Sequence, residues 1–363
     1  MMKVLHVINN LGVGGAESLL VSMIPLLREN LQIDIVLLDG QDTPFLQDLK
    51  KSKHLNIISL SKGSIYNPIH IFRLILIIRK YELVHVHLFP AMYFAAVAKF
   101  LSFSNVKLVF TEHSTGNRRL KSSLFRIIDR IIYLHYSKII CITPEVKDIL
   151  ISLGVNKSKL CVIYNGIEIV KFARARGYDR ATFGYLPSDI ILIMVAGFRR
   201  EKDHSSVVKA LSRLDHRYKL LLVGEGYQKN QVLEEVLNLG LENRVQFIGV
   251  RNDIDRLLKT CDIGILSSHW EGFGIAAVEA MAAGLPIVAS NVSGLSEVVD
   301  GGGLLFKKGN ITDLVSKIVS LEEKDYYSNI QRKCLDKAKQ YDLKTTVNQL
   351  LMLYKTLGQN HNK

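Results

Sequence analysis

The chain has 363 residues, a length that predicts two domains, each large enough to bury its own hydrophobic core. Hydrophobic residues make up 48% and charged residues 22%, a composition that excludes an intrinsically disordered or low-complexity chain. The net charge of +13 favours anionic partners, and by itself it does not choose among phosphates, acidic lipids and nucleic acid.

The four cysteines, Cys141, Cys161, Cys261 and Cys334, lie far apart and form no Cys-x-x-Cys pair and no metal-type spacing with histidine. They predict reduced thiols in the cytoplasm and no zinc site. The N-terminal apolar run is too short for a signal peptide, and the longest apolar stretch, Leu83 to Leu101, is interrupted by histidine, proline and lysine. We therefore expect no membrane-spanning helix. If the protein meets a membrane, it should lie on the surface, at the inner face of the plasma membrane.

The N-terminal half alternates short β-branched runs with segments of helical periodicity, which is the pattern of β-α-β units. The predicted strands are Val4–Ile8, Ile33–Leu38, Leu83–His87, Lys107–Thr111, Lys138–Ile142 and Leu160–Tyr164, and the predicted helices are 17–29, 69–80 and 122–135. The pattern indicates a parallel sheet with helices on both faces.

The alternation stops between Glu168 and Pro187, where basic residues and glycines show no clear period, and then it resumes. The second series has predicted strands 190–195, 219–223, 245–248, 263–266 and 286–289, and predicted helices 205–214, 230–237, 254–260 and 275–283. The end of the chain is helical, and 343–357 carries a one-sided apolar stripe that should pack on another surface. We predict an α/β protein with two doubly wound domains, 1–170 and 187–342, a linker 171–186, and a C-terminal segment 343–363.

The positive charge is concentrated between Lys99 and Lys138, where eight residues are basic and two are acidic. The predicted helix in this segment has an apolar face with basic residues beside or opposite it. The apolar face consists of Leu124, Ile127, Ile128 and Ile131, and the basic residues include Arg126 and Arg130. Such a helix either packs its apolar face on the core and exposes a basic face, or lies on an anionic membrane surface.

The first predicted strand leads into a helix through a glycine-rich turn, Leu11-Gly12-Val13-Gly14-Gly15-Ala16-Glu17. Free amides at a helix N-terminus favour an anion or a closely approaching substrate. Alternatively, the turn needs its glycines only for positive φ angles. It lacks the dinucleotide fingerprint because Glu17 occupies the place of the third glycine, although Asp39 lies at about the distance of a ribose-binding acid; a nicotinamide enzyme is therefore disfavoured.

The most specific signal lies in the second half, in the segment 269–279, which reads His-Trp-Glu-Gly-Phe-Gly-Ile-Ala-Ala-Val-Glu directly after a predicted strand. Gly272 and Gly274 allow the backbone to bend into a helix start whose amides suit a diphosphate. A buried carboxylate needs hydrogen-bond donors, and the vicinal hydroxyls of a sugar or ribose offer two at once to Glu271 and Glu279. The alternative is that Glu271 caps the helix and Glu279 is exposed on it.

Taken together, several motifs in their order along the chain resemble the retaining GT-B glycosyltransferases of the large family-four class. These motifs are Gly14-Gly15-Ala16-Glu17, Val162 to Ile167, Phe198 to His204, Val223-Gly224-Glu225-Gly226, the Glu271-x7-Glu279 element and Gly284-Leu285-Pro286. The resemblance extends roughly from Val4 to Tyr354. It implies two Rossmann-like domains facing across a cleft, with the acceptor bound by the first domain and the nucleotide sugar by the second. It also implies that the C-terminal helix crosses back to the first domain.

The resemblance also implies roles for individual residues. Glu271 would touch the donor-sugar hydroxyls, Glu279 would hold the ribose, and Lys202 would stabilise the charge of the leaving diphosphate. The family usually has an arginine where this chain has Gly197. Either Arg199 or Arg200 could replace it, or Lys202 could serve as the one cation of the pocket. His113 matches a family histidine near the donor sugar, although a lone histidine after a strand is more often structural. The donor loop would include Gly224, Gly272, Phe273, Gly274 and Ile275, and the acceptor side would include Gly14, Gly15 and Glu17.

The function implied is transfer of a sugar from a nucleotide diphosphate to an acceptor hydroxyl with retention of anomeric configuration, in bacterial surface polysaccharide or lipopolysaccharide assembly. The partners would be a nucleotide sugar, a sugar or lipid-linked acceptor, and an anionic membrane surface. No cofactor and no metal are expected, because Asp253-Ile254-Asp255 opens a predicted helix and is interpreted as a cap.

Three other classes of function share some of these features. A nucleotide-sugar epimerase can share the architecture and is the main alternative. A nucleic-acid-binding protein would also be basic, but no recognised module is present. A glycosidase needs its two carboxyls on opposite sides of a bond, and not on one loop and helix start.

Overall fold

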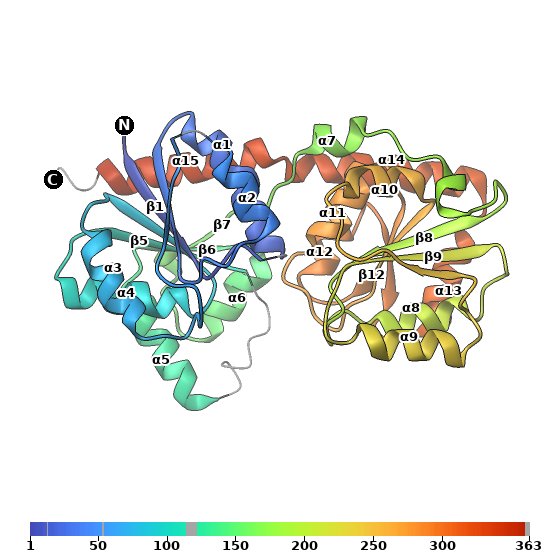
Figure 1. Ribbon diagram of the computed structural model, residues 1–363, viewed down its shortest axis with the longest axis horizontal. Coiled ribbons are helices and arrows are strands. Elements are labelled where there is room, and N and C mark those ends of the chain that lie inside the picture. Colours follow the sequence, from blue (N-terminus) through green and yellow to red (C-terminus); the bar gives the residue numbers. More distant parts are fainter. Residues whose placement is uncertain (13, 53, 114–121, 360–363) are drawn as a thin grey trace. The chain divides into compact units, whose positions relative to one another are not determined.

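The computed structural model (Figure 1) describes residues 1–12, 14–52, 54–113 and 122–359 of the chain. It contains two compact units. Unit 1 comprises Met1–Gly166 and Leu343–Lys363, and unit 2 comprises Ile167–Asp342. Each unit is built on one parallel sheet, and each is described by itself.

The sheet of unit 1 has seven strands in the order β3-β2-β1-β4-β5-β6-β7, all paired in parallel. The strands are β1 (Lys3–Ile8), β2 (Gln32–Leu37), β3 (Asn56–Ser59), β4 (Leu83–His87), β5 (Lys107–Glu112), β6 (Lys138–Cys141) and β7 (Leu160–Val162). The central strand β1 is buried from Val4 onward because helices cover both faces, so its side chains do not alternate between apolar and polar. Val4 is in register with Ile33 on one side and Leu83 on the other.

The helices between these strands are α1 (Gly15–Arg28), α2 (Pro44–Lys50), α3 (Ile69–Ile78), α4 (Ala91–Ser102), α5 (Ser123–Leu134) and α6 (Pro144–Ser152), followed by the 3₁₀ turn η2 (Lys157–Lys159). Helices α2 and α6 each begin with a Thr-Pro pair. The hydroxyls of Thr43 and Thr143 accept hydrogen bonds from the amides of Leu46 and Val146, at 3.2 and 3.3 Å. Proline at the first helical position has no amide to leave unsatisfied, so these pairs fix where the two helices start.

The last helix, α15 (Leu343–Gln359), belongs to unit 1, where it packs against α1. Its stripe of Val347, Leu350, Leu351 and Tyr354 is buried, as the periodicity predicts. The Tyr354 hydroxyl shares a hydrogen bond with Nδ1 of His85 in β4, so the end of the chain is joined to the centre of the first sheet.

The sheet of unit 2 has six parallel strands in the order β10-β9-β8-β11-β12-β13. They are β8 (Ile190–Val195), β9 (Tyr218–Val223), β10 (Val245–Phe247), β11 (Ile263–Leu266), β12 (Ile287–Asn291) and β13 (Leu304–Lys307). The α-helices are α7 (Ile169–Arg174), α8 (His204–Leu211), α9 (Lys229–Asn238), α10 (Ile254–Thr260), α11 (Ile275–Ala282), α12 (Leu295–Val299), α13 (Ile311–Ser320) and α14 (Lys324–Ala338), and the 3₁₀ turns are η3 (Arg180–Phe183) and η4 (Lys339–Tyr341). Both units are therefore doubly wound α/β structures, as predicted.

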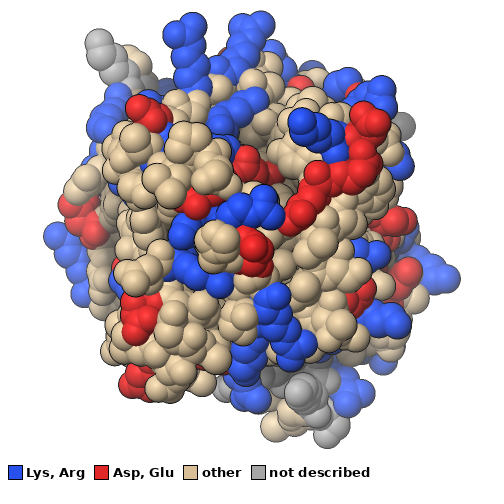
Figure 2. Space-filling model, turned by 90° about the vertical axis from the view of Figure 1, so that its right-hand side faces the viewer, with Lys and Arg blue, Asp and Glu red and all other residues tan. Residues whose placement is uncertain are grey.

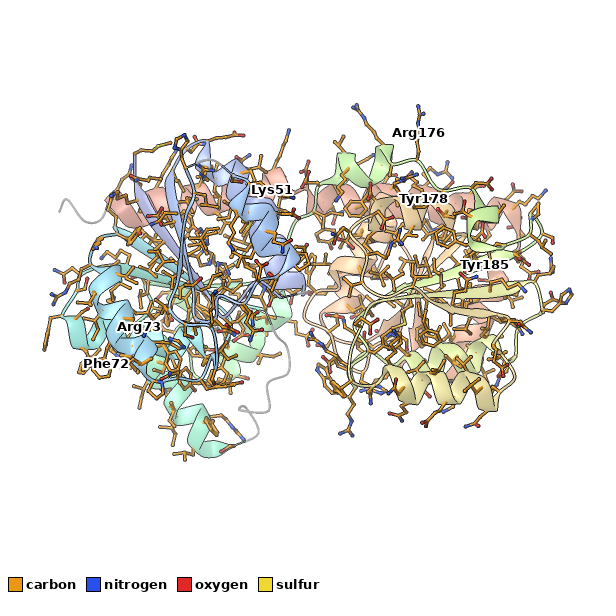
Figure 3. The ribbon with its side chains drawn as sticks, in the orientation of Figure 1. Lys51, Phe72, Arg73, Arg176, Tyr178 and Tyr185 are labelled. Carbon is orange, nitrogen blue, oxygen red and sulfur yellow. The ribbon has the colours of Figure 1, made fainter. Side chains whose placement is uncertain are left out.

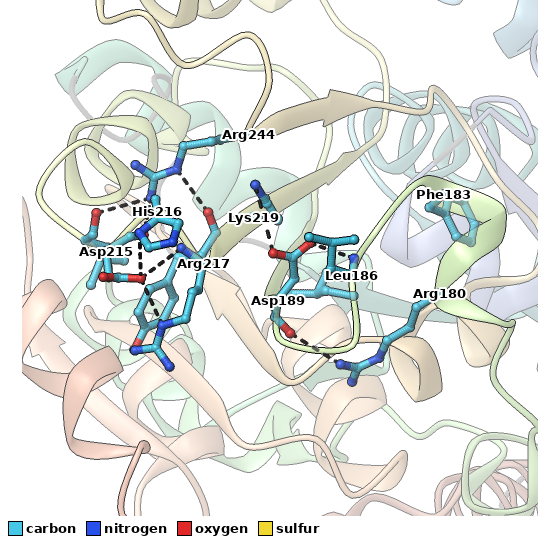
Figure 4. Close-up of polar contacts among 12 residues, drawn as sticks. Arg180, Phe183, Leu186, Asp189, Asp215, His216, Arg217, Lys219 and Arg244 are labelled. Atoms are coloured by element: carbon cyan, nitrogen blue, oxygen red, sulfur yellow. Dashed lines mark hydrogen bonds and ion pairs between the residues drawn. The ribbon is translucent and has the colours of Figure 1, made fainter.

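The segment 171–186, which we interpreted as a linker, belongs to unit 2 in the structure. Helix α7 packs against α11, and the rest of the segment is fixed by polar contacts (Figure 4). Arg180 pairs with Asp262 at 2.6 Å and donates to the carbonyl of Asp189 at 3.4 Å, while the Asp189 carboxylate accepts from the amide of Leu186 at 2.8 Å. Figure 3 shows Tyr178 and Tyr185 on this segment, and Tyr185 is buried. Arg180, a basic residue of this segment, is thus paired with an acidic side chain, which a count of charges does not reveal.

Several elements were not predicted, and each has a physical reason. Strand β3 has four residues at the edge of the sheet, too few for a period to show. The apolar stretch 83–101 is a buried strand, β4, followed by helix α4, which starts after Pro90. The strand lies where it is predicted, but the continuous apolar character of the stretch hides helix α4, because a buried strand and a buried helix look alike in sequence.

Candidate functional site

A candidate site in unit 2 lies at the carboxyl ends of β8 and β11, where the strand order reverses. Loops diverge at such a reversal and leave a crevice in which α/β proteins bind ligands. The loop after β8 carries Arg199 to Asp203, and the loop after β11 carries His269 to Gly274. The two loops are joined directly, because the amide of His269 donates to the carbonyl of Glu201 at 2.8 Å.

Lys202 and Glu271, one from each loop, form an ion pair between Nζ and Oε2. Their side chains are 20% and 16% exposed, so the pair is largely withdrawn from water yet still reachable from solvent. The amide of Gly272 also donates to Glu271 Oε1, at 3.3 Å. A cation beside a carboxylate can bind a ligand that carries both an anionic group and hydroxyl donors.

Asp203 supports this pair, although its role was not predicted. It caps helix α8 by accepting from the amide of Ser206 at 3.3 Å, and its other oxygen accepts from the Ser267 hydroxyl at 3.2 Å. Nε2 of His269 lies 3.9 Å from the same carboxylate. Asp203 therefore links the two loops and fixes the backbone next to Lys202. The feature of the sequence that could have indicated this role is an aspartate just before a helical run.

Two glycines allow the loop around Glu271 to approach its neighbours closely. Gly274 caps helix α11 with a φ of +84°, and Gly294 has a φ of +79°. A Cβ atom on Gly294 would overlap the carbonyl oxygen of Glu271 and lie 2.7 Å from the carbonyl oxygen of Gly272. The segment before α12 therefore packs closely against the Glu271 loop, and only glycine at position 294 leaves room for this contact.

Glu279 lies in the middle of helix α11 and is half-buried, so the alternative in which it is exposed on the helix does not describe it. Burial, opposed by Lys171 and assisted by Asp255, raises the pKa of its carboxyl to about 7. No hydrogen bond to this carboxylate is found within the described ranges. A carboxylate in this state has acceptor oxygens that a pair of hydroxyls could satisfy.

The structure distinguishes between the two arginines that could replace the missing family arginine. A Cβ on Gly197 would lie 3.6 Å from Nε of Arg199, so the Arg199 side chain already covers the position of Gly197. Both arginines are exposed, but no such contact with Gly197 is found for Arg200 among the nearest neighbours of that position. The backbone amide of Arg200 donates to the hydroxyl of Tyr227 at 3.1 Å. Arg199 is thus the better-placed cation of the two.

Other predicted donor-loop residues have structural roles. The amide of Gly224 already donates to the carbonyl of Gly249 at 2.8 Å, and its φ of +143° lets the backbone touch the carbonyl of Ala196. Phe273 is buried, with its ring edge against Tyr341 at 5.3 Å between centroids. Ile275 begins α11, where first-turn amides have no partner within the helix. We therefore expect contacts through the backbone around Gly272 to Ile275, and not through the Phe273 ring.

A second candidate site lies in unit 1, after β1. Gly14 caps helix α1 with an extended φ of −163°, so the positive-φ explanation for this glycine is wrong. A Cβ there would lie 3.1 Å from Cδ of Glu17, whose carboxylate folds back over the turn. Gly15 begins the helix. A carboxylate over these amides disfavours an anion and suits a ligand that donates hydroxyl groups. Val13 lies outside the described residues.

Three buried histidines meet at the centre of the same sheet: His6 on β1, and His85 and His87 on β4. Nδ1 of His6 and Nε2 of His87 share a hydrogen bond of 3.1 Å, and Nε2 of His85 bonds to the Thr111 hydroxyl at 2.7 Å. Burial lowers the pKa of His6 to about 3 and holds the pKa values of His85 and His87 well below the ordinary value. These imidazoles are therefore neutral at physiological pH.

His113 follows β5, and its ring centroid lies 5.8 Å from that of His87. Both of its ring nitrogens are buried and have no hydrogen-bond partner among the residues described, and burial lowers its pKa to about 4. The predicted site histidine is therefore neutral and has hydrogen-bonding capacity to spare. Residues 114–121, which follow it, lie outside the described part of the chain.

The group of described residues that could hold a metal is His6, His85 and His87, whose ring nitrogens lie within 4.8 Å of one another. Binding there would require breaking a hydrogen bond of His85, whose two ring nitrogens are bonded to the Tyr354 and Thr111 hydroxyls. The Asp253-Ile254-Asp255 motif lies at the start of helix α10. Asp253 occupies the N-cap position of α10, but its carboxylate pairs with Arg251 at 2.6 Å and accepts from the Tyr178 hydroxyl, so its predicted capping hydrogen bond is absent. The Arg251 guanidinium holds the Asp253 pKa well below its usual range.

Comparison with protein families accounts for the two units. Residues 13–171 match the model of Glycosyltransferase Family 4, and residues 179–341 match the model of Glycosyl transferases group 1. The chain belongs to this class of GT-B glycosyltransferases, as its motifs predicted.

Similar proteins share this assignment. N-acetyl-alpha-D-glucosaminyl L-malate synthase of Bacillus anthracis is 31% identical over 248 residues, which cover 66% of this chain and 65% of that protein. The N-acetylgalactosamine-N,N'-diacetylbacillosaminyl-diphospho-undecaprenol 4-alpha-N-acetylgalactosaminyltransferase of Campylobacter jejuni is 24% identical, covering 94% of this chain and 96% of that protein. The crystal structure of HepE from Anabaena, in complex with UDP and glucose, has a TM-score of 0.87 at 23% identity and covers 98% of this chain and 100% of its own. The predicted GT-B fold class is confirmed.

The buried histidines should make stability fall in acid. Because their pKa values are depressed in the folded chain, the unfolded chain binds more protons below about pH 6.5, and the free energy of unfolding falls as pH drops toward 4. Each histidine contributes a slope of about 1.4 kcal/mol per pH unit. Glu279 has the opposite sign but is a single group. Urea unfolding followed by circular dichroism from pH 5 to 8 should show a smaller slope in His6→Asn than in the original chain. Equal slopes would contradict the assignment.

The close approach at Gly294 can be tested against a matched glycine. Gly294→Ala introduces a Cβ at a positive φ and in overlap with Glu271. Gly309→Ala also introduces a Cβ at a positive φ, +70°, but with open space around it. We expect Gly309→Ala to cost about 1 kcal/mol and Gly294→Ala clearly more. Trp270 is the one tryptophan in the chain and precedes Glu271, so its emission spectrum should shift in Gly294→Ala alone. Matching spectra and stabilities in the two variants would show that the overlap is relieved at no cost.

Proposed function

We propose that the protein is a retaining glycosyltransferase, which moves a sugar from a nucleotide-diphosphate sugar to the hydroxyl of a sugar or lipid-linked acceptor. The observation that carries the proposal is the Lys202–Glu271 pair at the strand-order reversal of unit 2, with half-buried Glu279 on the helix that follows. Unit 2 would bind the donor. The acceptor is assigned to unit 1, beside Gly14, Gly15 and Glu17.

The donor's functional groups match those of the site. Its diphosphate is anionic and suits Lys202 together with Arg199. Its sugar hydroxyls can donate to Glu271, and its ribose diol can donate to the Glu279 carboxylate. Without donor, the charge of Lys202 is balanced by Glu271. When the donor binds, its hydroxyls take over part of that carboxylate and leave the ammonium group to the phosphate oxygens.

The proposed reaction breaks the bond between the anomeric carbon and the diphosphate oxygen and forms a bond between that carbon and the acceptor oxygen on the same face. The acceptor proton passes to the leaving diphosphate oxygen, so no protein nucleophile is consumed. Lys202 stabilises the negative charge that develops on the diphosphate. His113 is neutral, so it would act on the donor sugar as a hydrogen-bonding group and not as a cation. No metal is assigned to the reaction.

The proposed process is bacterial surface polysaccharide or lipopolysaccharide assembly, with an acceptor on a membrane lipid diphosphate. Support comes from the Campylobacter relative, whose name specifies a diphospho-undecaprenol acceptor. The free thiols of Cys141, Cys161, Cys261 and Cys334 suit a reducing compartment, the cytoplasmic side of the membrane. None of the described helices combines the length and apolarity that crossing a membrane requires.

A panel of nucleotide sugars, screened by thermal shift, should identify a donor that raises the melting temperature. Incubation of that donor with lipid-diphosphate sugar acceptors should then give a product whose anomeric configuration, measured by NMR, equals that of the donor. An inverted product would contradict retention, and conversion of the donor to its epimer without acceptor would favour the epimerase alternative. Activity should survive extensive treatment with EDTA; a loss restored by a divalent cation would contradict the metal-free proposal.

Lys202→Ala should lower kcat about 10²- to 10³-fold, the usual effect of removing one group that stabilises developing negative charge. Lys209→Ala is the matched control, because Lys209 is a half-exposed lysine of α8 paired with Glu235 at 3.1 Å. It should leave kcat unchanged. Circular dichroism should confirm that both variants fold. Equal kcat values in the two variants would remove Lys202 from the mechanism.

Donor affinity should depend on the ionisation of Glu279. The ionised carboxylate accepts from both ribose hydroxyls, so the donor binds that form better and should lower the pKa from its value of about 7. Affinity measured by calorimetry should therefore weaken as pH falls from 8 to 6 and level off above about pH 8. Glu279→Gln should bind more weakly and show a flat profile. A pH-dependent profile that persists in Glu279→Gln would assign the titration to another group.

A further inference from the structure

Large apolar side chains are exposed in a concentrated group on helices α3, α4 and α5 of unit 1 and beside their ends. We call this group the α3–α5 face. It comprises Tyr66, Ile69, Phe72, Leu76, Phe100, Leu101, Phe103, Leu124, Phe125, Ile127, Ile131 and Leu134. Phe103, at the end of α4, is 90% exposed, and Leu76 is 74% exposed. Scattered apolar residues on a surface need no explanation, but a continuous group of this size marks an interaction site.

The exposed residues follow the helical period. On α3, Ile69, Phe72 and Leu76 point outward, while Leu74 and Ile78 are buried between them. Figure 3 labels Phe72 on this helix, next to Arg73. A helix covering a sheet normally presents polar residues to water on its outer side, but here the outer stripe is apolar as well.

Helix α5 shows the same arrangement. Its sequence left open whether its apolar face packs on the core. Leu124, Ile127 and Ile131 are 63%, 60% and 53% exposed, and Leu134 continues the stripe. The interpretation that this apolar face packs on the core is therefore wrong. The inner side of α5 is formed instead by residues such as Ile132 and Tyr133, which are buried.

The three helices form one layer beside the sheet of unit 1 (Figure 1). Arg79, after α3, donates to the carbonyl of Ser102 at the end of α4, and Tyr93 of α4 donates to Asp129 of α5. Tyr136, just after α5, donates to the carbonyl of Met92 at 2.6 Å. The two outer stripes and the end of α4 therefore lie on neighbouring helices of one layer.

The exposed charges of this layer have a single sign. Arg73, Arg126 and Arg130 are exposed on α3 and α5, and the one acidic residue in the three helices, Asp129, is buried. Unit 2 differs. Figure 2 shows basic and acidic side chains intermixed on the face that it presents. Within unit 2, Arg217 pairs with Asp215 at 2.9 Å and with Glu322 at 3.7 Å.

We infer that the α3–α5 face lies on an anionic lipid surface, with its apolar side chains among the acyl chains at the boundary and its arginines at the headgroups. Lipid suits a face that is apolar and basic, because the bilayer supplies both acyl chains and negative charge. A symmetric contact with a second copy would instead bring the arginines of both copies together, with no exposed acid on these helices to balance them. The inference deepens the proposed lipid-linked acceptor, but it depends on the surface alone.

Vesicle flotation of the full chain tests the inference at low salt. We expect binding to vesicles of phosphatidylcholine with phosphatidylglycerol, and weak binding to phosphatidylcholine alone. Phe72→Ser with Leu76→Ser should lower the bound-to-free ratio at least about tenfold. Arg73→Gln with Arg126→Gln should remove the preference for anionic vesicles. The control pair, Leu237→Gln with Val319→Gln, changes exposed apolar residues of unit 2 and should change nothing.

Absence of binding by the original chain, or equal binding by the Phe72/Leu76 and control pairs, would overturn the inference. So would a dimer, seen by analytical ultracentrifugation, that only the Phe72/Leu76 pair disrupts while vesicle binding is absent. Sugar transfer to a water-soluble acceptor should be unchanged in all these variants. Transfer without vesicle binding would contradict this inference alone, and vesicle binding without transfer would contradict the proposed function alone.

Discussion

The constraint on which the candidate donor site depends is the reversal of strand order between β8 and β11. Parallel strands present their carboxyl ends at one edge of the sheet, and at a reversal the loops that leave those ends diverge. The divergence brings Lys202 and Glu271 from loops almost seventy residues apart into contact. The same geometry crowds the backbone, and it is tolerated because Gly294 and Gly224 have no side chain where carbonyl groups of neighbouring loops approach.

Burial sets the ionisation of the site residues in opposite directions for one physical reason: a group withdrawn from water favours its neutral form. It keeps His6 and His113 uncharged, and it brings the Glu279 carboxyl to a pKa of about 7, where a ligand's hydroxyls can tip the balance. Lys202 and Glu271 form an ion pair across the two loops. Unit 2 therefore contains a half-buried carboxyl, Glu279, and an ion pair, Lys202–Glu271. Both can form hydrogen bonds with a ligand that carries hydroxyl and phosphate groups.

The two units dispose of their charge differently. In unit 2, surface cations such as Arg217 and Arg180 have acidic partners, and the segment once expected to be a linker is held by such pairs. In unit 1, the arginines of α3 and α5 stand among exposed apolar side chains. The net charge of the chain is therefore informative only once its distribution is known, because paired cations attract little and unpaired ones attract anionic surfaces.

The sequence by itself determined what depends on local pattern. Its periodicity predicted most strands, the boundaries of β4, α10 and β11, and the buried stripe of α15, and its motifs predicted the family and the residues 202 and 271. It could not show α2, β3 and α4, because short or continuously apolar elements carry no distinct period. Only the tertiary structure decided that Glu279 is half-buried, that Arg199 covers Gly197, that Asp203 joins two loops, and that the apolar face of α5 is outside. Each of these depends on which distant segments pack together, and that packing is a property of the folded chain and not of any local stretch of it.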